Sequence, residues 1–527
     1  MTTTVRPPAQ QDDDAPLSRR AAKRERSKER AERRRPRPAP TLYKTAGGFA
    51  GIGGGKWNRM GVPPEFLASS VQLCGLWPFV AGSSRPSVGV PLGPDMDALS
   101  TVCCDPISWF IAGFISNPSI MLFGLPGLGK SSVAARMIIG CADRGIPSLI
   151  FGDLKPDYAE LIEELGGLVI PVGPGLAQIN PLDLGALLEA AARIGGEDGA
   201  ALTRLAESKA VELTISIAQI VRRRPLEDFE ETVLTEAIAI VRKTSAQPQL
   251  RDVLNLLDEA NPELMVLTLS ENATEFRRTI TPLHRTVQAL LRGPMGQVFG
   301  GATSTPIPVD NPGGVCVDIS GLREGDEQLL AAVMLATWAH GFAAVDATWE
   351  LSRHGMANWN GFLTVQDELW RPLRASSGLV DRLDSLSRTN RAQGVGEIRI
   401  THSLKDAESL STEQDRNKAR GFAERAGMIG VLGLDRSDLR TLAQNVNLSQ
   451  AEIDRVASWR IPQSWKSGQR DRDGRPLAPP GAGKILLKVG GRAGIPVQFQ
   501  ITERERDLHD TNARWGNRDK NEEEELL

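Results

Sequence analysis

The stretch Gly124–Ser132, GLPGLGKSS, meets the spacing G-x-x-x-x-G-K-[ST]. Glycines in such a loop let backbone N–H groups turn inward and approach a polyphosphate, and a helix that follows adds the positive end of its dipole. In this pattern Lys130 reaches the outer phosphates and the Ser131 hydroxyl reaches a magnesium ion. We therefore expect ATP and Mg2+ as cofactors. The predicted nucleotide-binding residues are Gly124, Gly127, Gly129, Lys130, Ser131 and Ser132.

An acidic pair further along the chain can complete this chemistry. Hydrolysis needs a carboxylate that holds magnesium and a base that orients water. Asp367 and Glu368 follow the apolar run FLTV at 362–365, where a strand is predicted to end. We assign Asp367, together with Ser131, to the magnesium shell and Glu368 to the activation of water. The alternative is a pair of surface acids that cap the next helix.

Two other predicted strands also end in polar residues. Thr401 and His402 end the run EIRITHS, at the place where a side chain could sense the outer phosphate. The alternative for His402 is a packing or helix-capping histidine. Asp153 and Lys155 end the strand of FGDLKPDY. They either orient magnesium, or relay the nucleotide state, or form a simple turn at the strand end.

Ring-shaped ATPases complete such a site with an arginine from the neighbouring subunit, which stabilises charge in the transition state. The sequence offers Arg388, Arg391 and Arg492, and we choose Arg492 because it lies in the glycine-rich turn GGRAG. A surface arginine is the alternative for each of them. The predicted catalytic residues are therefore Lys130, Glu368, His402 and Arg492.

Alternating strands and helices have to position these side chains. Short apolar runs bounded by glycine or proline predict strands, and a helix with apolar residues at helical spacing follows Lys130. This alternation indicates an α/β fold with a mostly parallel sheet. The predicted strands are 119–123, 147–153, 166–172, 314–320, 362–365 and 396–403, and a further helix is predicted over about 329–345.

Two regions interrupt or extend that pattern. Residues 185–300 carry apolar stripes at helical spacing and predict an all-helical insertion subdomain. Two late runs, 484–489 and 496–501, flank the turn GGRAGI and predict a C-terminal β-hairpin at the sheet edge. The predicted order is a basic arm (1–41), a lead-in rich in Gly and Pro (42–115), an NTPase domain in two parts (116–184 and 301–505) around the insertion (185–300), and an acidic tail (506–527).

The composition is that of an ordinary globular protein, with 527 residues, 41% hydrophobic and 24% charged, and a net charge of −3. No apolar run of about 18 residues occurs, so we predict no membrane span. The five cysteines form no CxxC pair, which argues against zinc and for a reducing compartment, and we expect a cytoplasmic protein.

The basic arm has too few apolar residues to fold. It is either a solubilising tail or a dock for acidic lipid, nucleic acid or an acidic partner.

With these motifs placed, the chain resembles the conjugation and type IV secretion ATPases of the FtsK/HerA superfamily (TraG/TraC-like). The matching segments are NPSIMLFGLPGLGKSS, GDLKPDYAELIEELGG, FLTVQDELW and RITHSLKD, with the helical insertion between them, and they span roughly residues 105–440. The block GRAGIPVQFQITERERDLHDTNARW looks like the end of related proteins on actinobacterial mobile elements. Where these ATPases carry Thr-Gln-Ser, this chain has Thr401, His402 and Ser403, and histidine can also donate a hydrogen bond.

The resemblance implies a RecA-like P-loop NTPase that forms a homo-hexamer, hydrolyses ATP at subunit interfaces and acts on membrane-embedded components of a transfer channel. Full secretion ATPases carry a large N-terminal domain, and because only about a hundred residues precede the phosphate loop we expect a trimmed version, with the contacts of that domain supplied elsewhere. We therefore expect a motor of a conjugation or type IV secretion apparatus, attached peripherally to the membrane through its basic arm. Two alternatives stay open: a coupling-type ATPase that binds and translocates DNA directly, and a nucleotide-gated scaffold with little turnover.

Overall fold

The computed structural model describes residues 43–45, 48–50, 85–308, 311–323, 325–368, 390–405, 413–460 and 481–508. The chain divides into two compact units, Met1–Ala81 and Gly82–Leu527. In the first unit the described residues form an antiparallel hairpin of β1 (Tyr43–Thr45) and β2 (Gly48–Ala50). The predictions for the basic arm, for Arg388 and for tail residues 509–527 lie outside the described residues.

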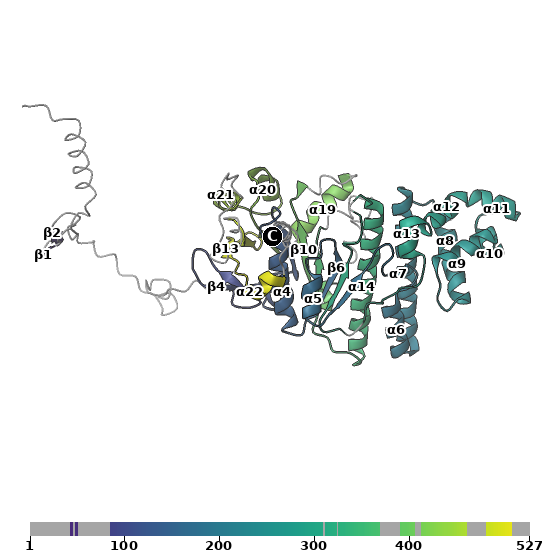
Figure 1. The fold of residues 1–527 in the computed structure, drawn as a ribbon, viewed down its shortest axis with the longest axis horizontal. Coiled ribbons are helices and arrows are strands. Elements are labelled where there is room, and N and C mark those ends of the chain that lie inside the picture. Colours follow the sequence, from purple (N-terminus) through teal and green to yellow (C-terminus); the bar gives the residue numbers. More distant parts are fainter. Residues whose placement is uncertain are drawn as a thin grey trace, which may run out of the picture. The chain divides into compact units, whose positions relative to one another are not determined.

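The described residues of the second unit build a nine-stranded sheet (Figure 1). Its strand order is β13-β12-β11-β5-β10-β9-β6-β8-β7, and every neighbouring pair from β11 to β7 is parallel. The antiparallel strands β12 and β13 form one edge. This confirms the predicted α/β fold with a mostly parallel sheet and a C-terminal β-hairpin. The strands are β5 (Ser119–Phe123), β6 (Ser148–Asp153), β7 (Leu168–Pro171), β8 (Val315–Asp318), β9 (Phe362–Gln366), β10 (Val395–Thr401), β11 (Met428–Val431), β12 (Lys484–Lys488) and β13 (Ile495–Gln498).

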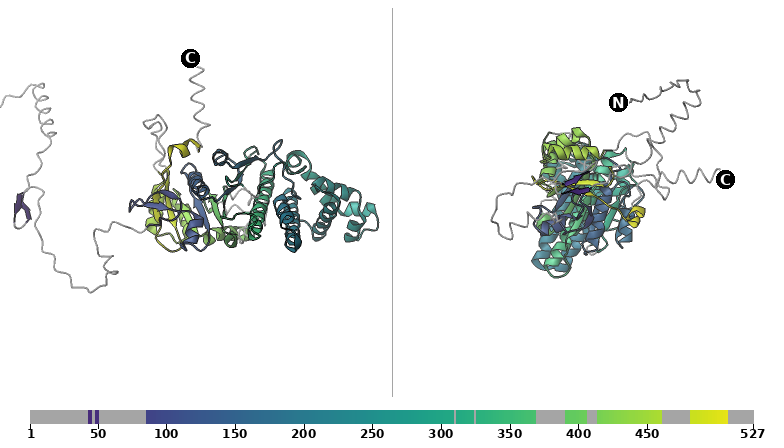
Figure 2. Two further views of the ribbon diagram at one scale, coloured as in Figure 1. Left: turned by 90° about the horizontal axis from the view of Figure 1, so that it is seen from below. Right: turned by 90° about the vertical axis from the view of Figure 1, so that its left-hand side faces the viewer.

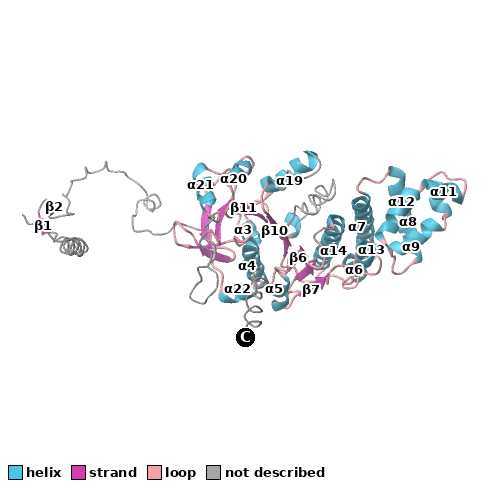
Figure 3. Cartoon of the chain, turned by 45° about the horizontal axis from the view of Figure 1, so that its top comes forward, coloured by secondary structure: helices cyan, strands magenta, loops and turns pink. Residues whose placement is uncertain are grey.

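Helices cover both faces of this sheet, which explains why a strand such as β5, SIMLF, is buried along its whole length. On one face, α4 (Lys130–Ala142) and α5 (Ala159–Glu164) share a core with Leu122 of β5 and Ile398 of β10. On the other face, α14 (Glu327–Arg353) packs on β6, where the rings of Phe342 and Phe151 lie 5.0 Å apart. Figure 3 shows these helices beside the strands of the sheet.

The helix predicted at 329–345 is longer in the structure, because α14 continues as far as Arg353. By length and composition α14 could cross a membrane, but 89% of its most apolar stretch is buried inside the protein. Its apolar sequence is therefore explained by burial between the sheet and the helices that follow β7.

Those helices form the predicted all-helical insertion. They pack against α14 and share one apolar core with it, so the insertion extends the hydrophobic layer on that face of the sheet. Figures 1 and 2 show the insertion beyond α14, at the far end of this unit from the C-terminal hairpin. The helices are α6 (Gly185–Ile194), α7 (Gly196–Arg222), α8 (Asp228–Thr244), α9 (Leu250–Asp258), α10 (Pro262–Leu267), α11 (Ala273–Thr279), α12 (Thr281–Leu290) and α13 (Gly293–Phe299).

At the hairpin edge, the first and last described segments of the second unit meet. β13 ends at Gln498, before the end of the predicted run 496–501, because the next backbone N–H groups leave the ladder. The N–H of Phe499 donates to Gly483 O and that of Gln500 to Leu92 O. The surrounding elements are β3 (Pro91–Pro94), β4 (Thr101–Cys103), α3 (Pro106–Ile111), α17 (Asn390–Gln393), α19 (Glu413–Arg425), α20 (Arg436–Ala443), α21 (Gln450–Ser458) and α22 (Glu503–Leu508).

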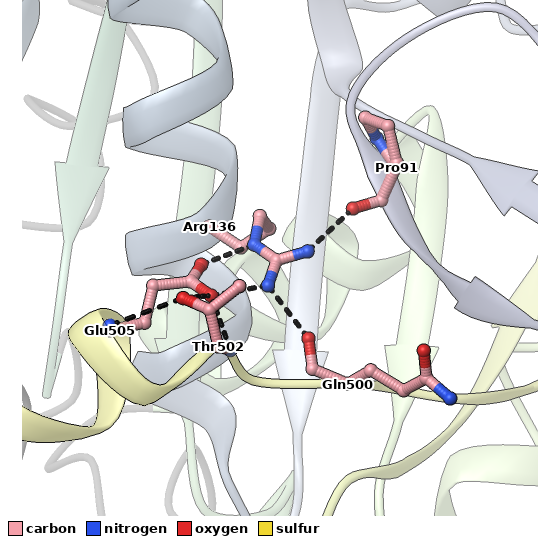
Figure 4. Close-up of polar contacts among 5 residues, drawn as sticks. All are labelled: Pro91, Arg136, Gln500, Thr502 and Glu505. Atoms are coloured by element: carbon pink, nitrogen blue, oxygen red, sulfur yellow. Dashed lines mark hydrogen bonds and ion pairs between the residues drawn. The ribbon is translucent and has the colours of Figure 1, made fainter.

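Arg136 fastens these segments to α4 (Figure 4). Its guanidinium donates to Pro91 O of β3 at 2.9 Å and to Gln500 O at 2.7 Å, and it forms a forked ion pair with Glu505 of α22. Thr502 donates its N–H and hydroxyl to the same carboxylate. Burial alone would raise the pKa of Glu505, but the hydrogen bonds from Arg136 and Thr502 outweigh it, and the pKa is lowered. Arg136 thus joins the helix after the phosphate loop to β3 and to the segment from Gln500 to Glu505.

We expect Arg136→Met to lower the free energy of unfolding by about 2 kcal/mol, because it leaves a mostly buried carboxylate and two carbonyl groups without their donor. Urea unfolding of the full chain measures the change. The matched control is Arg504→Met, whose partner Glu164 lies 2.8 Å away across an exposed ion pair, so the loss there should stay below about 0.5 kcal/mol. Equal losses in the two variants would show that the Arg136 contacts add nothing to an ordinary surface pair.

Candidate active site

The loop between β5 and α4 has the backbone that its glycines predict. Gly127 and Gly129 adopt φ angles of 75° and 100°, in the left-handed region that favours glycine. A Cβ atom at Gly124 would come within 2.7 Å of the Leu432 Cβ atom, so the strand end packs too closely for a side chain. Gly129 caps α4 without a side chain, and the first turn of α4 carries no acidic residue. The open N–H groups of this helix end therefore suit an anion.

Lys130 is 9% exposed and folds back over the loop. Its Nζ atom donates to the carbonyl oxygens of Gly124 at 2.7 Å and Leu125 at 3.3 Å, and it lies 3.3 Å from Nδ1 of His402. Ser131 and Ser132 follow in the first turn of α4 and are half-buried. Lys130 therefore packs on the loop, and the two serines follow it directly in the same helix turn.

Strand order brings the acidic pair to this cluster. β10 lies between β5 and β9, and all three run parallel, so their C-terminal ends share one edge of the sheet. Phe123 of β5 is level with Thr401 of β10, and Gln366 of β9 is level with Arg399. The phosphate loop and the acidic pair therefore leave the same edge of the sheet, one strand apart.

His402 bridges the two motifs. One ring nitrogen, Nδ1, contacts Lys130, and the other, Nε2, lies 3.2 Å from Oε1 of Glu368. Its backbone carbonyl also accepts the N–H of Gly124 at 3.2 Å. The structure therefore places His402 in the site as a link between both predicted motifs, which a histidine used only for packing would not be.

Asp367 and Glu368 are held in a tight local turn. The N–H of Glu368 donates to Oδ1 of Asp367 at 2.8 Å, and Glu368 adopts φ 49°, an uncommon angle for a residue with a side chain. Such a backbone persists only where the surroundings fix it, and it is typical of functional sites. Glu368 is 9% exposed, so its carboxylate is largely buried.

Tyr158 is a site residue that the sequence analysis missed. Its ring is fully buried, and its hydroxyl donates to Oδ2 of Asp367 at 3.0 Å. Burial, and after it the Glu368 charge, raise the pKa of Asp367 to about 6, although the hydrogen bonds from Glu368 N–H and the Tyr158 hydroxyl lower it. The available signal was FGDLKPDY, which puts one of only two tyrosines in the chain in a polar turn after a strand.

Asp153 shapes the turn that presents Tyr158. Its carboxylate ends β6 and accepts the N–H groups of Asp157 at 3.1 Å and Tyr158 at 2.8 Å. Burial raises the pKa of Asp153 to about 8, although these two hydrogen bonds favour the charged form. Of the two interpretations from sequence, a turn is what the structure shows for Asp153, and the turn lies beside the acidic pair.

The arginines predicted to act in a neighbouring subunit lie away from this edge. Arg391 precedes β10 in α17, with its guanidinium 5.7 Å from the centre of the Phe110 ring. Arg492 is exposed in the turn between β12 and β13. Since β12 is antiparallel to β11, that turn lies at the edge where the parallel strands begin. Neither arginine can reach the site of its own chain, and their role in a neighbouring subunit stays a prediction.

The residues at this edge fit a nucleotide with Mg2+. Lys130, two left-handed glycines and an uncapped helix end suit a polyphosphate. Asp367, whose pKa is raised by burial, suits a cation, because a cation would favour its charged form. The hydroxyl of Ser131 and the carboxylate of Asp367 are the oxygen ligands that Mg2+ prefers.

A solved structure with a similar fold is VirB4 of Thermoanaerobacter pseudethanolicus. The two chains align with a TM-score of 0.56 and 18% sequence identity, over 80% of this chain and 99% of that chain. This chain shares the VirB4 fold. The plasmid coupling protein TrwB, in complex with the non-hydrolysable ATP analogue ADPNP, aligns over 83% of this chain and 93% of its own, with 14% identity and a TM-score of only 0.45. No profile of a known family matches the sequence, and no curated protein matches it. The likeness to VirB4 confirms the expected type of fold.

The raised pKa of Asp153 predicts a pH dependence of stability in metal-free buffer. Between the ordinary aspartate pKa and about 8, the folded protein binds a proton that the unfolded chain has lost. Stability should therefore fall as pH rises through this window, by at most about 1.4 kcal/mol per pH unit for one group.

We expect Asp153→Asn to flatten that decline, as measured by urea unfolding at pH 5, 6, 7 and 8 with a chelator. The exposed residue Asp143 at the end of α4 gives the control, Asp143→Asn, which should keep the slope of the parent. An unchanged slope in Asp153→Asn would mean that Asp153 is charged in the folded protein throughout this range.

Proposed function

We propose that this chain hydrolyses ATP in the presence of Mg2+ and powers a conjugation or type IV secretion apparatus, energising its assembly or the transfer of DNA or protein. The observation that carries the proposal is the chain of contacts Lys130–His402–Glu368, which joins the phosphate loop to the acidic pair at one edge of the sheet. The sequence resemblance and the fold shared with VirB4 support the role in transfer.

Each residue of the edge has a task in this reaction. The backbone N–H groups after Gly124 and the Lys130 ammonium bind the polyphosphate. Ser131 and Asp367 hold Mg2+, which when bound neutralises charge on the phosphates. Glu368 orients the attacking water and accepts its proton. His402 lies between Lys130 and Glu368, and it would sense the outer phosphate by exchanging one of these two contacts for a hydrogen bond to the phosphate.

We propose that the ATPase works as a homo-hexamer. Arg391 and Arg492 lie at the opposite edge of the sheet from Lys130 in the same chain. Either of these two arginines could therefore complete such a site only in a neighbouring copy. We also propose that the motor works in the cytoplasm, with the basic arm 1–41 attaching it to the membrane and to channel components.

A coupling-type ATPase that translocates DNA is the second candidate, and it shares the same site. The specific feature in its favour is the Arg- and Lys-rich segment of the arm, which could bind phosphate backbones. Turnover of size-resolved oligomers, measured with and without single-stranded and duplex DNA, separates the two. Stimulation by DNA favours the translocase, and indifference to DNA favours the assembly motor.

We expect Glu368→Gln to keep ATP binding and to lower kcat by about a hundredfold or more, since the amide cannot accept a proton from water. Steady-state turnover and the affinity for a fluorescent ATP analogue measure the two effects. The comparison variant Lys130→Ala should lose the binding itself. Turnover equal to that of the parent would remove Glu368 from the mechanism, and a parent without turnover would favour the nucleotide-gated scaffold.

We expect Tyr158→Phe to raise the Mg2+ concentration needed for half-maximal turnover by about tenfold. The hydroxyl favours the charged form of Asp367, so its loss leaves a weaker ligand, by about 1.5 kcal/mol for one hydrogen bond to a charged group. At saturating Mg2+ the variant should approach the turnover of the parent. A variant that is equally impaired at every Mg2+ concentration would show that Tyr158 acts on something other than the metal ligand.

A further inference from the structure

The loop between β6 and α5 contacts both acids of β9. β6 is the parallel neighbour of β9, with Ile150 level with Val365, so the loop leaves the sheet directly beside the acidic pair. Tyr158, in the last position of the loop, donates to Asp367. Lys155, in its middle, lies with Nζ 3.6 Å from Oε1 of Glu368. Two side chains from one short turn therefore reach two adjacent carboxylates.

Hydrogen bonds to Asp153 fix the backbone of this turn, and so they fix the backbone position from which the Lys155 side chain extends. Asp153 is 2% exposed and binds the N–H groups of Asp157 and Tyr158, which folds residues 153–158 back over the strand end. The side chain of Lys155 is 58% exposed. The side chain is therefore mostly in contact with solvent, while its ammonium group lies close to Glu368.

Glu368 is contacted from both neighbouring strands at the same oxygen. His402, after β10, lies 3.2 Å from Oε1, and Lys155, after β6, lies 3.6 Å from it. Glu368 has left the ladder of β9 with a left-handed backbone, so the pairing of the strand does not fix its direction. Its carboxylate is held by these flanking side chains.

We propose that Lys155 is a positioning residue that holds the carboxylate of Glu368 in the orientation needed to activate water. The inference rests on the proposed ATP hydrolysis. A general base works only within hydrogen-bond reach of its water, and a displacement of about 1 Å can lower a rate by up to a hundredfold. His402 contacts the carboxylate of Glu368 from the side of β10, and Lys155 contacts the same oxygen from the side of β6.

The contact between Lys155 and Glu368 is weak. A separation of 3.6 Å is longer than an ordinary hydrogen bond, and the lysine is more than half exposed, so this is a weak ion pair. Its loss should leave the fold intact and change the direction of the carboxylate. The consequence should appear in kcat and not in the binding of nucleotide, because Lys155 contacts the base and not the phosphate loop.

The test compares Lys155→Met, Lys155→Arg and the parent by kcat and KM for ATP at saturating Mg2+. We expect kcat to fall about tenfold in Lys155→Met, with KM within about twofold of the parent. Lys155→Arg should recover most of the loss, because the guanidinium keeps the charge and the reach. Lys243→Met, which removes an exposed lysine from α8 in the insertion, is the matched control and should leave both constants unchanged.

A second background shows whether the effect passes through Glu368. Glu368→Asp draws the carboxylate back by one methylene, out of reach of Lys155. In that background Lys155→Met should change kcat by less than about twofold, because the contact no longer exists. A tenfold loss in both backgrounds would overturn the proposal, as would a Lys155→Met variant as active as the parent, and in either case the ATPase itself would stand. A parent without turnover would instead remove the proposed function, and the role of Lys155 with it.

Discussion

The parallel pairing of β5 with β10 and of β10 with β9 is the constraint on which the site depends. It sets Lys130 and Glu368 one strand apart at the same edge of the sheet and leaves His402, at the end of the intervening strand, between them. A change of order or direction in any of these strands would separate the two motifs. The charged side chains meet because backbone hydrogen bonds of the sheet have already fixed where each strand ends.

Burial opposes the charged forms of the carboxyl groups at the site. Asp153 and Asp367 both have raised pKa values because they have left water. Two backbone N–H groups offset part of this cost for Asp153, and the Tyr158 hydroxyl does so for Asp367. A cation beside them would stabilise the charged forms further. Perturbed carboxylates with specific donors in a loop-lined edge are typical of functional sites.

β10, the strand that ends just before His402, also carries a buried ion pair. β10 alternates, with Ile398 packed towards α4 and the ion pair of Glu397 and Arg399, 2.7 Å apart, buried on the other face. The Arg399 guanidinium lies 4.9 Å from the centre of the Phe422 ring in α19. A buried pair of this kind adds little net stability but is costly to break, so it fixes the position of the strand. The central strand of the site is thereby tied to a helix well away from the phosphate loop.

The sequence by itself determined the local conformations and the class of fold. The glycine spacing of Gly124–Lys130 sets a backbone that only glycine adopts easily, and apolar periodicity separates strands, insertion and hairpin. Each of these patterns is formed by residues that are near one another in the sequence, so it can be recognised without knowing the fold.

Only the tertiary structure decided which distant side chains meet. Nothing near Tyr158 in the sequence indicates that its hydroxyl contacts Asp367, and nothing near Lys155 indicates Glu368. The tertiary structure also placed Arg492 at the edge away from Lys130, because the direction of β12 relative to β11 depends on long-range pairing. Side-chain contacts between separate strands follow from strand order and register, and no local pattern of residues encodes these.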